Sequence, residues 1–357
     1  MTTVPRPDPL AVLPAFAVPG GGTARARPLE GGLIHDSFRI EWDGGPLGTA
    51  VLQRLAADVF PDPPAIAANL AALRDAWADC PQAPPLPEPI PVREGGWLWR
   101  DGTGRYWRMW HWIEGRVCSA PPGAAECTAL GEVLGRFHRC ANRPGPIRFR
   151  TTLPGFHHTP GHLRRLDELV AASPLPSTAE GRYLARCIAR ERASAGRLQQ
   201  ALAAGLVRLR VVHGDPRLDN LLFEPGGSRV VALLDLDTVQ PGLIHHDLAD
   251  ALRSACCVQA GEEVDYDTGR AAAILRAWFA VAGDLLSPPE RRLLLPALRL
   301  LPFELGLRFL SDHLAGDRYF RVSAPGENLQ RALVQFRLLD ALDARRGELE
   351  AALAACG

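Results

Sequence analysis

The chain contains no lysine. All 40 of its basic residues are arginine, and 40 aspartates and glutamates balance them to a net charge of zero. Without lysine, a Schiff base, a Walker-type lysine and a lysine general base are all excluded. The absence of a basic excess argues against a protein that binds nucleic acid or a membrane surface. The composition therefore favours neither a nucleic acid nor a membrane as a partner.

The sequence also lacks paired cysteine motifs and long apolar runs. Its eight cysteines are scattered without a CxxC pair that could hold a metal, and we expect them to be free thiols in a reducing compartment. Residues 1–16 lack the pattern of a signal peptide, and no segment approaches the ~18 uninterrupted apolar residues of a membrane span. These absences predict a soluble, cytoplasmic protein.

The length of 357 residues predicts two domains or two joined lobes. The chain is 47% hydrophobic, which is enough to form a sizeable core. Residues 24–55 alternate strand-like segments with glycine turns, which predicts an antiparallel meander. Pro63 and Pro64 then open a helix, and residues 95–113 are again strand-like. Together they predict a small α+β lobe over residues 1–115.

After Gly115 the pattern of the sequence becomes typical of helices. Apolar residues at helical spacing predict a helix that ends near Cys140. Further helices are expected over residues 161–171, 177–203, 266–282, 288–314 and 328–355. The second lobe, residues 116–357, is therefore predicted to be mostly helical, with one compact hairpin inside residues 207–239.

This compact block carries the residues suited to chemistry, and it reads VRLRVVHGDPRLDNLLFEPGGSRVVALLDLDTV. A strand-like run ends at His213, a polar loop follows, and a hairpin turns at Gly226-Gly227. Asp215 and Asp235 lie 20 residues apart in the sequence. The hairpin should bring them to neighbouring strand ends.

The segment HGDPRLDN resembles the H-x-D-x4-N catalytic loop of the protein-kinase superfamily. Its HGD form and the LLDLD continuation are more similar to the aminoglycoside and choline phosphotransferase branch. Within that branch, segments such as GLIHDSF, YWRMWHWIEG, LPGFHHTP and RFLSDHLAGDRYF resemble the N-acetylhexosamine 1-kinases. The resemblance implies a two-lobed protein-kinase-like fold, ATP in the cleft, and phosphorylation of the anomeric hydroxyl of an N-acetylhexosamine.

Phosphoryl transfer requires a positioned hydroxyl, divalent ions on the phosphates and a carboxylate that accepts the hydroxyl proton. By resemblance Asp215 is the base, and Asn220 and Asp235 are hard oxygen ligands suited to Mg²⁺. His213 should brace the loop. Asp247 should cap a helix and anchor the catalytic loop.

In the first lobe, strand alternation aligned on V-A-I-K places Arg54 where kinases carry a phosphate-binding lysine, with Gln53 on the other face. Arginine can bind phosphate with paired donors. The helix that follows offers no glutamate to pair with it. The backbone of a hinge that runs from Met109 through His111 to Ile113 would contact adenine.

Three features stay open at this point. Residues 30–38, EGGLIHDSF, occupy the place of a glycine-rich loop but lack its G-x-G-x-x-G pattern. Asp237 is either a second carboxylate near the metal or the start of a turn. Asp250 and Arg253 are expected to form a solvated pair on a helix.

The acceptor pocket is expected in the helical lobe, around His157, Arg308, Asp312 and Tyr319, because fork-like donors, carboxylates and aromatic faces bind sugars. An ion pair between Arg308 and Asp312 at i, i+4 is the alternative. Rival readings are a kinase for an aminoglycoside or an amino alcohol, and a catalytically inactive nucleotide-binding protein. Arginine in the pocket argues against a polycationic acceptor.

Overall fold

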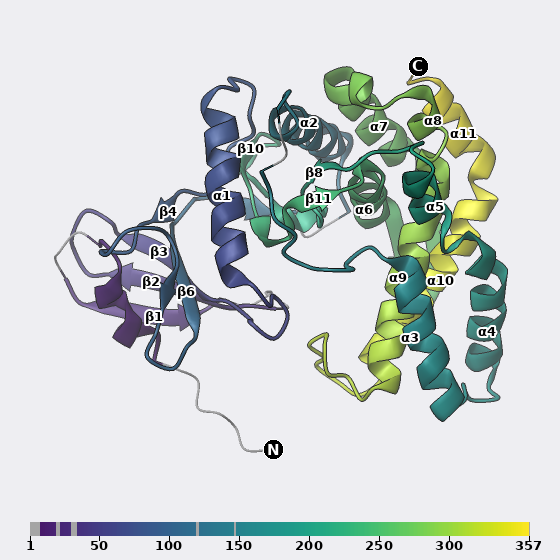
Figure 1. The fold of residues 1–357 in the computed structure, drawn as a ribbon, viewed down its shortest axis with the longest axis horizontal. Coiled ribbons are helices and arrows are strands. Elements are labelled where there is room, and N and C mark those ends of the chain that lie inside the picture. The colour runs from purple at the N-terminus through teal and green to yellow at the C-terminus, as the bar shows by residue number, and fades with distance from the viewer. Residues whose placement is uncertain (1–7, 19–21, 30–33, 119–120, 146–147, 357) are drawn as a thin grey trace.

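The computed structural model describes residues 8–18, 22–29, 34–118, 121–145 and 148–356 (Figure 1). Its N-terminal part is a six-stranded antiparallel sheet in the order β1-β2-β3-β6-β4, with β5 paired to β6. The predicted meander is present as its first three strands. The strands are β1 (Ala24–Pro28), β2 (Asp36–Trp42), β3 (Thr49–Arg54), β4 (Pro89–Ile90), β5 (Trp99–Arg100) and β6 (Tyr106–His111).

The two faces of this sheet differ in chemistry because successive side chains of a strand point to opposite sides. Phe38, Leu52 and Met109 are paired across β2, β3 and β6 and are buried in one apolar cluster. The short helix η1 (Pro9–Ala15) contributes Val12 to the same cluster. The opposite face carries polar side chains toward the helical lobe.

Helix α1 (Pro63–Ala78) starts as the sequence predicts, with proline in its first turn and Asp62 accepting a hydrogen bond from the Ala65 amide at 3.2 Å. Its apolar residues Leu70 and Leu73 join a core shared with Phe137 rather than the core of the sheet. Figure 1 shows α1 standing between the sheet and the helices. By its packing α1 therefore belongs with the helical lobe.

Two large apolar clusters hold the helical lobe together. The expected helix over residues 177–203 is divided into two helices by a short 3-10 turn, and the one over residues 288–314 is divided near residue 293. The helices are α2 (Ala124–Ala141), α3 (Thr159–Ala172), α4 (Ala179–Glu191), α5 (Arg197–Ala203), α6 (Ile244–Cys256), α7 (Thr268–Ala282), α8 (Pro288–Arg291), α9 (Leu294–Leu314), α10 (Glu327–Ala344) and α11 (Arg346–Ala354), with 3-10 turns η2 (Arg192–Ser194) and η5 (Gly283–Leu285).

Short strands surround the predicted hairpin. One small sheet has the order β10-β9-β7, and β8 pairs with β11. A further hairpin of β12 and β13 was not predicted. The elements are β7 (Arg116–Val117), β8 (Arg210–Val212), η3 (Leu218–Asn220), β9 (Leu221–Phe223), β10 (Val230–Leu233), η4 (Leu236–Thr238), β11 (Gln240–Gly242), β12 (Cys257–Ala260) and β13 (Glu263–Tyr266).

The expectation that all eight cysteines are free thiols is wrong. Cys80 and Cys140 form a disulfide whose Cα atoms lie 5.9 Å apart. It joins the segment after α1 to the last turn of α2, and the sequence carried no signal for this pairing. Among the residues that the structure describes, no helix is long and apolar enough to cross a membrane.

Candidate active site

The predicted catalytic loop leaves β8 in a fixed conformation. Gly214 has φ +88°, and a Cβ there would lie 2.6 Å from the Thr238 carbonyl oxygen, so only glycine fits. The Asp247 carboxylate accepts hydrogen bonds from the backbone amides of His213 at 2.7 Å and Gly214 at 2.9 Å. The loop is thus fastened to helix α6.

Asp247 does not cap its own helix, which corrects that part of the prediction. Leu243 occupies the N-cap position of α6, and Asp247 lies in the first turn. Its second contact is with the buried His138, 2.9 Å away. Burial alone would raise the pKa of Asp247, but hydrogen bonds from His138 and Gly214 hold it below its ordinary value.

His213 is fully buried and lies between two strand ends. Its Nε2 lies 3.0 Å from the Leu234 carbonyl oxygen, and its Nδ1 accepts from the Asp215 amide at 3.3 Å. Burial lowers the pKa of His213, so the ring is neutral and donates from Nε2. It links Asp215 to the strand that precedes Asp235.

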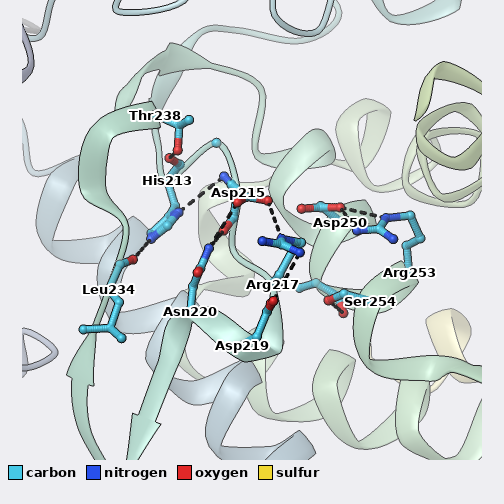
Figure 2. Close-up of polar contacts among 12 residues, drawn as sticks. His213, Asp215, Arg217, Asp219, Asn220, Leu234, Thr238, Asp250, Arg253 and Ser254 are labelled. Carbon is cyan, nitrogen blue, oxygen red and sulfur yellow. Dashed lines mark hydrogen bonds and ion pairs between the residues drawn. The ribbon is translucent and has the colours of Figure 1, made fainter. Parts of the chain in front are cut away.

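Asp215 lies at the centre of a polar network (Figure 2). Its carboxylate accepts from Arg217 Nε at 2.9 Å and from Asn220 Nδ2 at 3.2 Å. Burial raises its pKa to about 7, Arg217 opposes this rise, and the charges of Asp250 and Asp235 add to it. A carboxylate with a pKa near neutrality is suited to general base catalysis.

Asp250 and Arg253 were expected in solvent, and this expectation is wrong. Asp250 is only 5% exposed and interacts with the carboxyl group of Asp215. Arg253 Nε donates to Asp250 at 2.8 Å. The sequence showed the i, i+3 spacing of the pair but not that this face of α6 lies under the catalytic loop (Figure 2).

Asn220 and Asp235 are brought side by side by a backbone hydrogen bond of 2.8 Å from the Leu234 amide to the Asn220 carbonyl. Asn220 uses its Nδ2 on Asp215, which leaves Oδ1 as an acceptor. Asp235 adopts a left-handed conformation with φ 56°, which is costly for aspartate and typical of functional sites. Its side chain is exposed and accepts no hydrogen bond from the described residues. Two hard oxygen donors are therefore available for a divalent cation.

The pKa of Asp235 is raised although the residue opens to solvent. The surrounding protein desolvates the carboxyl group and raises its pKa, and the neighbouring negative charge of Asp237 raises it further. A bound cation would remove this penalty, since it favours the charged carboxylate.

Asp237 is fully buried and connects the two lobes. Arg108 of β6 donates to both of its oxygens, through Nη1 and, at 2.9 Å, through Nη2, and His35 Nε2 lies 2.5 Å away. Burial opposes ionisation, but Arg108 and His35 hold the pKa of Asp237 well below its ordinary value. Neither reading of Asp237 from the sequence included this inter-lobe ion pair.

Arg54 pairs with Asp36, its neighbour across β2 and β3, which supplies the carboxylate that the sequence left open. Gln53 points to the other face and accepts from Arg108 Nε at 2.9 Å. The Arg54 side chain is 28% exposed, whereas Arg108 is committed to Asp237 and is 9% exposed. Arg54 is thus the more accessible of the two, but it lies on the sheet face of Leu52, whereas Gln53 and Arg108 lie on the face toward the helical lobe. Its contact with phosphate stays a prediction. Part of the expected glycine-rich loop, residues 30–33, lies outside the described residues.

The three predicted hinge residues differ in their positions. The backbone of Met109 lies inside the sheet between β3 and β4, and the His111 amide donates to the Glu88 carbonyl at 2.9 Å. Ile113 follows the end of β6 and lies outside the sheet. Of the three, Ile113 is therefore the one whose backbone no strand pairing occupies.

Arg308 does not pair with Asp312, so the alternative ion pair is excluded. Its guanidinium lies over three aromatic rings, at 4.8 Å from Phe156, 5.8 Å from Tyr319 and 5.5 Å from Phe320. Within the described part of the chain, it has no carboxylate partner. A cation held by ring faces keeps its N–H donors for another ligand.

Asp312 is buried and organises the loop that carries Tyr319. Its Oδ1 accepts from the amides of Arg318 and Tyr319, and its Oδ2 accepts from the Phe320 amide and Asn328 Nδ2, all within 3.0 Å. With four donors already bound, Asp312 holds the loop in place rather than offering a free oxygen.

His157 lies below the catalytic loop instead of at a surface. Its Nδ1 is 2.8 Å from the buried Glu304, and its ring stacks on His246 at 4.4 Å. Burial alone would lower the pKa of His157, but Glu304 raises it, whereas burial and His157 lower the pKa of His246 to about 3. No motif or spacing in the sequence pointed to Glu304.

A family model described as the phosphotransferase enzyme family matches residues 25–283. The chain belongs to this family. The predicted two-lobed, protein-kinase-like fold is thereby confirmed, and the protein is a phosphotransferase of small molecules.

Solved structures of the family show the same fold. A microcompartment-associated aminopropanol kinase matches with a TM-score of 0.66 at 16% identity, over 94% of this chain and 97% of that one. An aminoglycoside phosphotransferase from Alicyclobacillus acidocaldarius matches with a TM-score of 0.64 at 17% identity, over 99% and 96%. Amicoumacin kinase, solved with AMP-PNP and Ca²⁺, matches with a TM-score of 0.59 at 13% identity, over 94% and 92%.

Proposed function

We propose that this phosphotransferase moves the γ-phosphoryl group of ATP to the anomeric hydroxyl of an N-acetylhexosamine. Asp215 would accept the hydroxyl proton, and Asn220 and Asp235 would hold Mg²⁺ on the phosphates. The observation that carries the reaction type is the arrangement of these three residues around one loop, with a base whose pKa lies near 7. Amicoumacin kinase, which binds AMP-PNP and Ca²⁺, supports a nucleotide and a divalent ion in this family.

The acceptor is inferred from the surroundings of Arg308. An unpaired guanidinium framed by aromatic rings suits an uncharged polar ligand, because it can donate paired hydrogen bonds to ring or acetamido oxygens. A polycationic aminoglycoside would meet like charge there. Arg54 would contact phosphate, and the backbone near Ile113 would contact adenine.

A screen of ATP consumption against free sugars, aminoglycosides and amino alcohols tests the proposal. We expect turnover with GlcNAc or GalNAc, and ³¹P NMR should identify the product as the 1-phosphate. A 6-phosphate, or turnover with an amino alcohol or aminoglycoside alone, would contradict the acceptor and leave the reaction type standing.

Arg308→Ala separates acceptor binding from nucleotide binding. The variant removes hydrogen-bond donors to the oxygens of the sugar. The value of kcat/KM for the sugar should therefore fall by the equivalent of about 1–3 kcal/mol. The KM for ATP should stay unchanged. Arg136→Ala is a suitable control, because Arg136 is an exposed arginine of α2 that pairs with Glu132 and contacts no residue of the proposed acceptor site.

A further inference from the structure

A cavity of about 440 Å³ opens beside the catalytic loop, on the side that Arg217 faces. Arg217 and Asp219 line it from the loop, Arg253 and Ser254 from the end of α6, and Arg270 from α7. Figure 2 shows Arg217, Asp219, Arg253 and Ser254 converging on this side of Asp215. Its volume lies in the range of small-molecule sites.

The three arginines keep free donors. Arg217 uses Nε on Asp215 and Nη1 on Asp219, and Arg253 uses Nε and Nη2 on Asp250. Arg270 uses only Nε, 3.2 Å from Asp267. Their remaining terminal nitrogens have no hydrogen-bond or ion-pair partner among the described residues.

Most of the charged side chains that line the cavity are arginines. Asp250 and Asp267 hold Arg253 and Arg270, but neither carboxylate lines the cavity. Three guanidinium groups and one carboxylate, that of Asp219, face the space, while Asp215, Asp250 and Asp267 pair with these arginines from outside the lining. Arginine forks match the oxygens of a phosphate and can bind it through parallel hydrogen bonds.

We propose that this cavity binds the phosphate group of a phosphorylated small molecule, with Arg217, Arg253 and Arg270 as donors. The oxygens of the phosphate would accept hydrogen bonds from the terminal nitrogens that these arginines keep free. The space beyond it, lined by Leu218, Ala255 and Val258, accommodates an uncharged organic part. The lining includes none of the residues proposed for adenine or for the sugar, and it meets the proposed active site at the catalytic loop, through Arg217, Leu218 and Asp219.

Calorimetric titration of the whole protein with inorganic phosphate and glucose 6-phosphate tests this site. Saturating Mg²⁺ and AMP-PNP would occupy the nucleotide position during the titration. We expect both phosphates to bind and unphosphorylated glucose not to bind. Because no phosphoryl group is transferred, the result does not depend on which acceptor the protein uses.

Arg270→Ala should weaken phosphate binding by ~10-fold or more, since a charged donor is lost. The matched control is Arg276→Ala, an exposed arginine of the same helix that does not line the cavity, and it should bind as the unaltered protein does. Equal affinity of Arg270→Ala and the unaltered protein would overturn the proposal. So would the absence of phosphate binding, or acetate binding as tightly as phosphate.

Discussion

Asp215 is the single side chain on which the proposed reaction depends most. Asp215→Asn keeps the shape of the residue and removes the proton acceptor, so kcat should fall by ~10²–10⁴. Nucleotide affinity should be retained, because Asp215 is not proposed to contact ATP. Near-normal turnover in this variant would disprove the assignment.

The raised pKa of Asp215 predicts the pH dependence of the reaction. A general base acts when unprotonated, so kcat/KM should rise with pH through a value near 7 and level off above it. Arg217 lowers this pKa and Asp250 raises it. Arg217→Gln should therefore shift the rise to higher pH, and Asp250→Asn to lower pH. Shifts in the same direction for both variants would contradict this account.

Two neighbouring carboxylates are expected to have different tasks. Asp235→Ala removes a proposed ligand of Mg²⁺, so Mg²⁺-dependent nucleotide binding, measured by calorimetry, should be lost while the fold is kept. Asp237→Ala leaves the buried Arg108 without its carboxylate partner, which should cost about 3–5 kcal/mol of stability. If Asp237→Ala abolished Mg²⁺-dependent nucleotide binding and Asp235→Ala only lowered stability, the metal would be placed on Asp237.

At the scale of an element, the loop after α9 depends on one buried carboxylate. Asp312→Asn exchanges an oxygen acceptor for an NH₂ group, so two backbone amides lose their partner and Tyr319 loses its fixed position. The KM for the sugar should increase about 10-fold, with the KM for ATP unchanged. A rise in both KM values would show that the loop supports the nucleotide as well.

The elements differ in how far the sequence predicts them. The meander and α1 carry strong local signals, glycine turns between alternating segments and proline at a helix start. Helix α6 is different, since His245, His246, Asp247 and Asp250 are all buried and no polar stripe marks a solvent face. Only the resemblance to known kinases indicated a helix there. Its polar residues serve the catalytic loop, so tertiary contacts override the local pattern.

At the scale of the molecule, the sequence placed the catalytic loop and the proposed metal ligands close together because one hairpin connects them. Contacts between distant segments could not be derived in this way. Arg108 and Asp237 are 129 residues apart, and His157 and Glu304 are 147 apart. Neither pair has a spacing that periodicity could detect. What the sequence missed is therefore mainly the set of ion pairs that join segments far apart in the chain.

The Cys80–Cys140 disulfide should contribute to the stability of the whole protein. It closes a loop with a sequence separation of 60, and such a crosslink typically adds about 2–4 kcal/mol. Dithiothreitol should therefore lower the midpoint of urea unfolding. The double variant Cys80→Ser, Cys140→Ser should unfold at this lower midpoint with or without the reductant. An unaltered protein that is insensitive to the reductant would exclude a structural role for the bond.

Helix α1 precedes the link between the lobes in the chain, but its apolar side chains pack in the core of the helical lobe. The side chain of Asn69 holds it there by hydrogen bonds to the backbone of Arg150 and Val239. The sheet alone is left to move when nucleotide enters or leaves. Its buried polar contacts with the helical lobe meet at Asp237, which Arg108 of β6 and His35, the residue before β2, both contact. We expect the sheet to rotate about this contact as a pivot. The ends of β1 and β2 at Ala24 and Trp42 would then travel farthest, while β6 and the start of β2 stay nearly still.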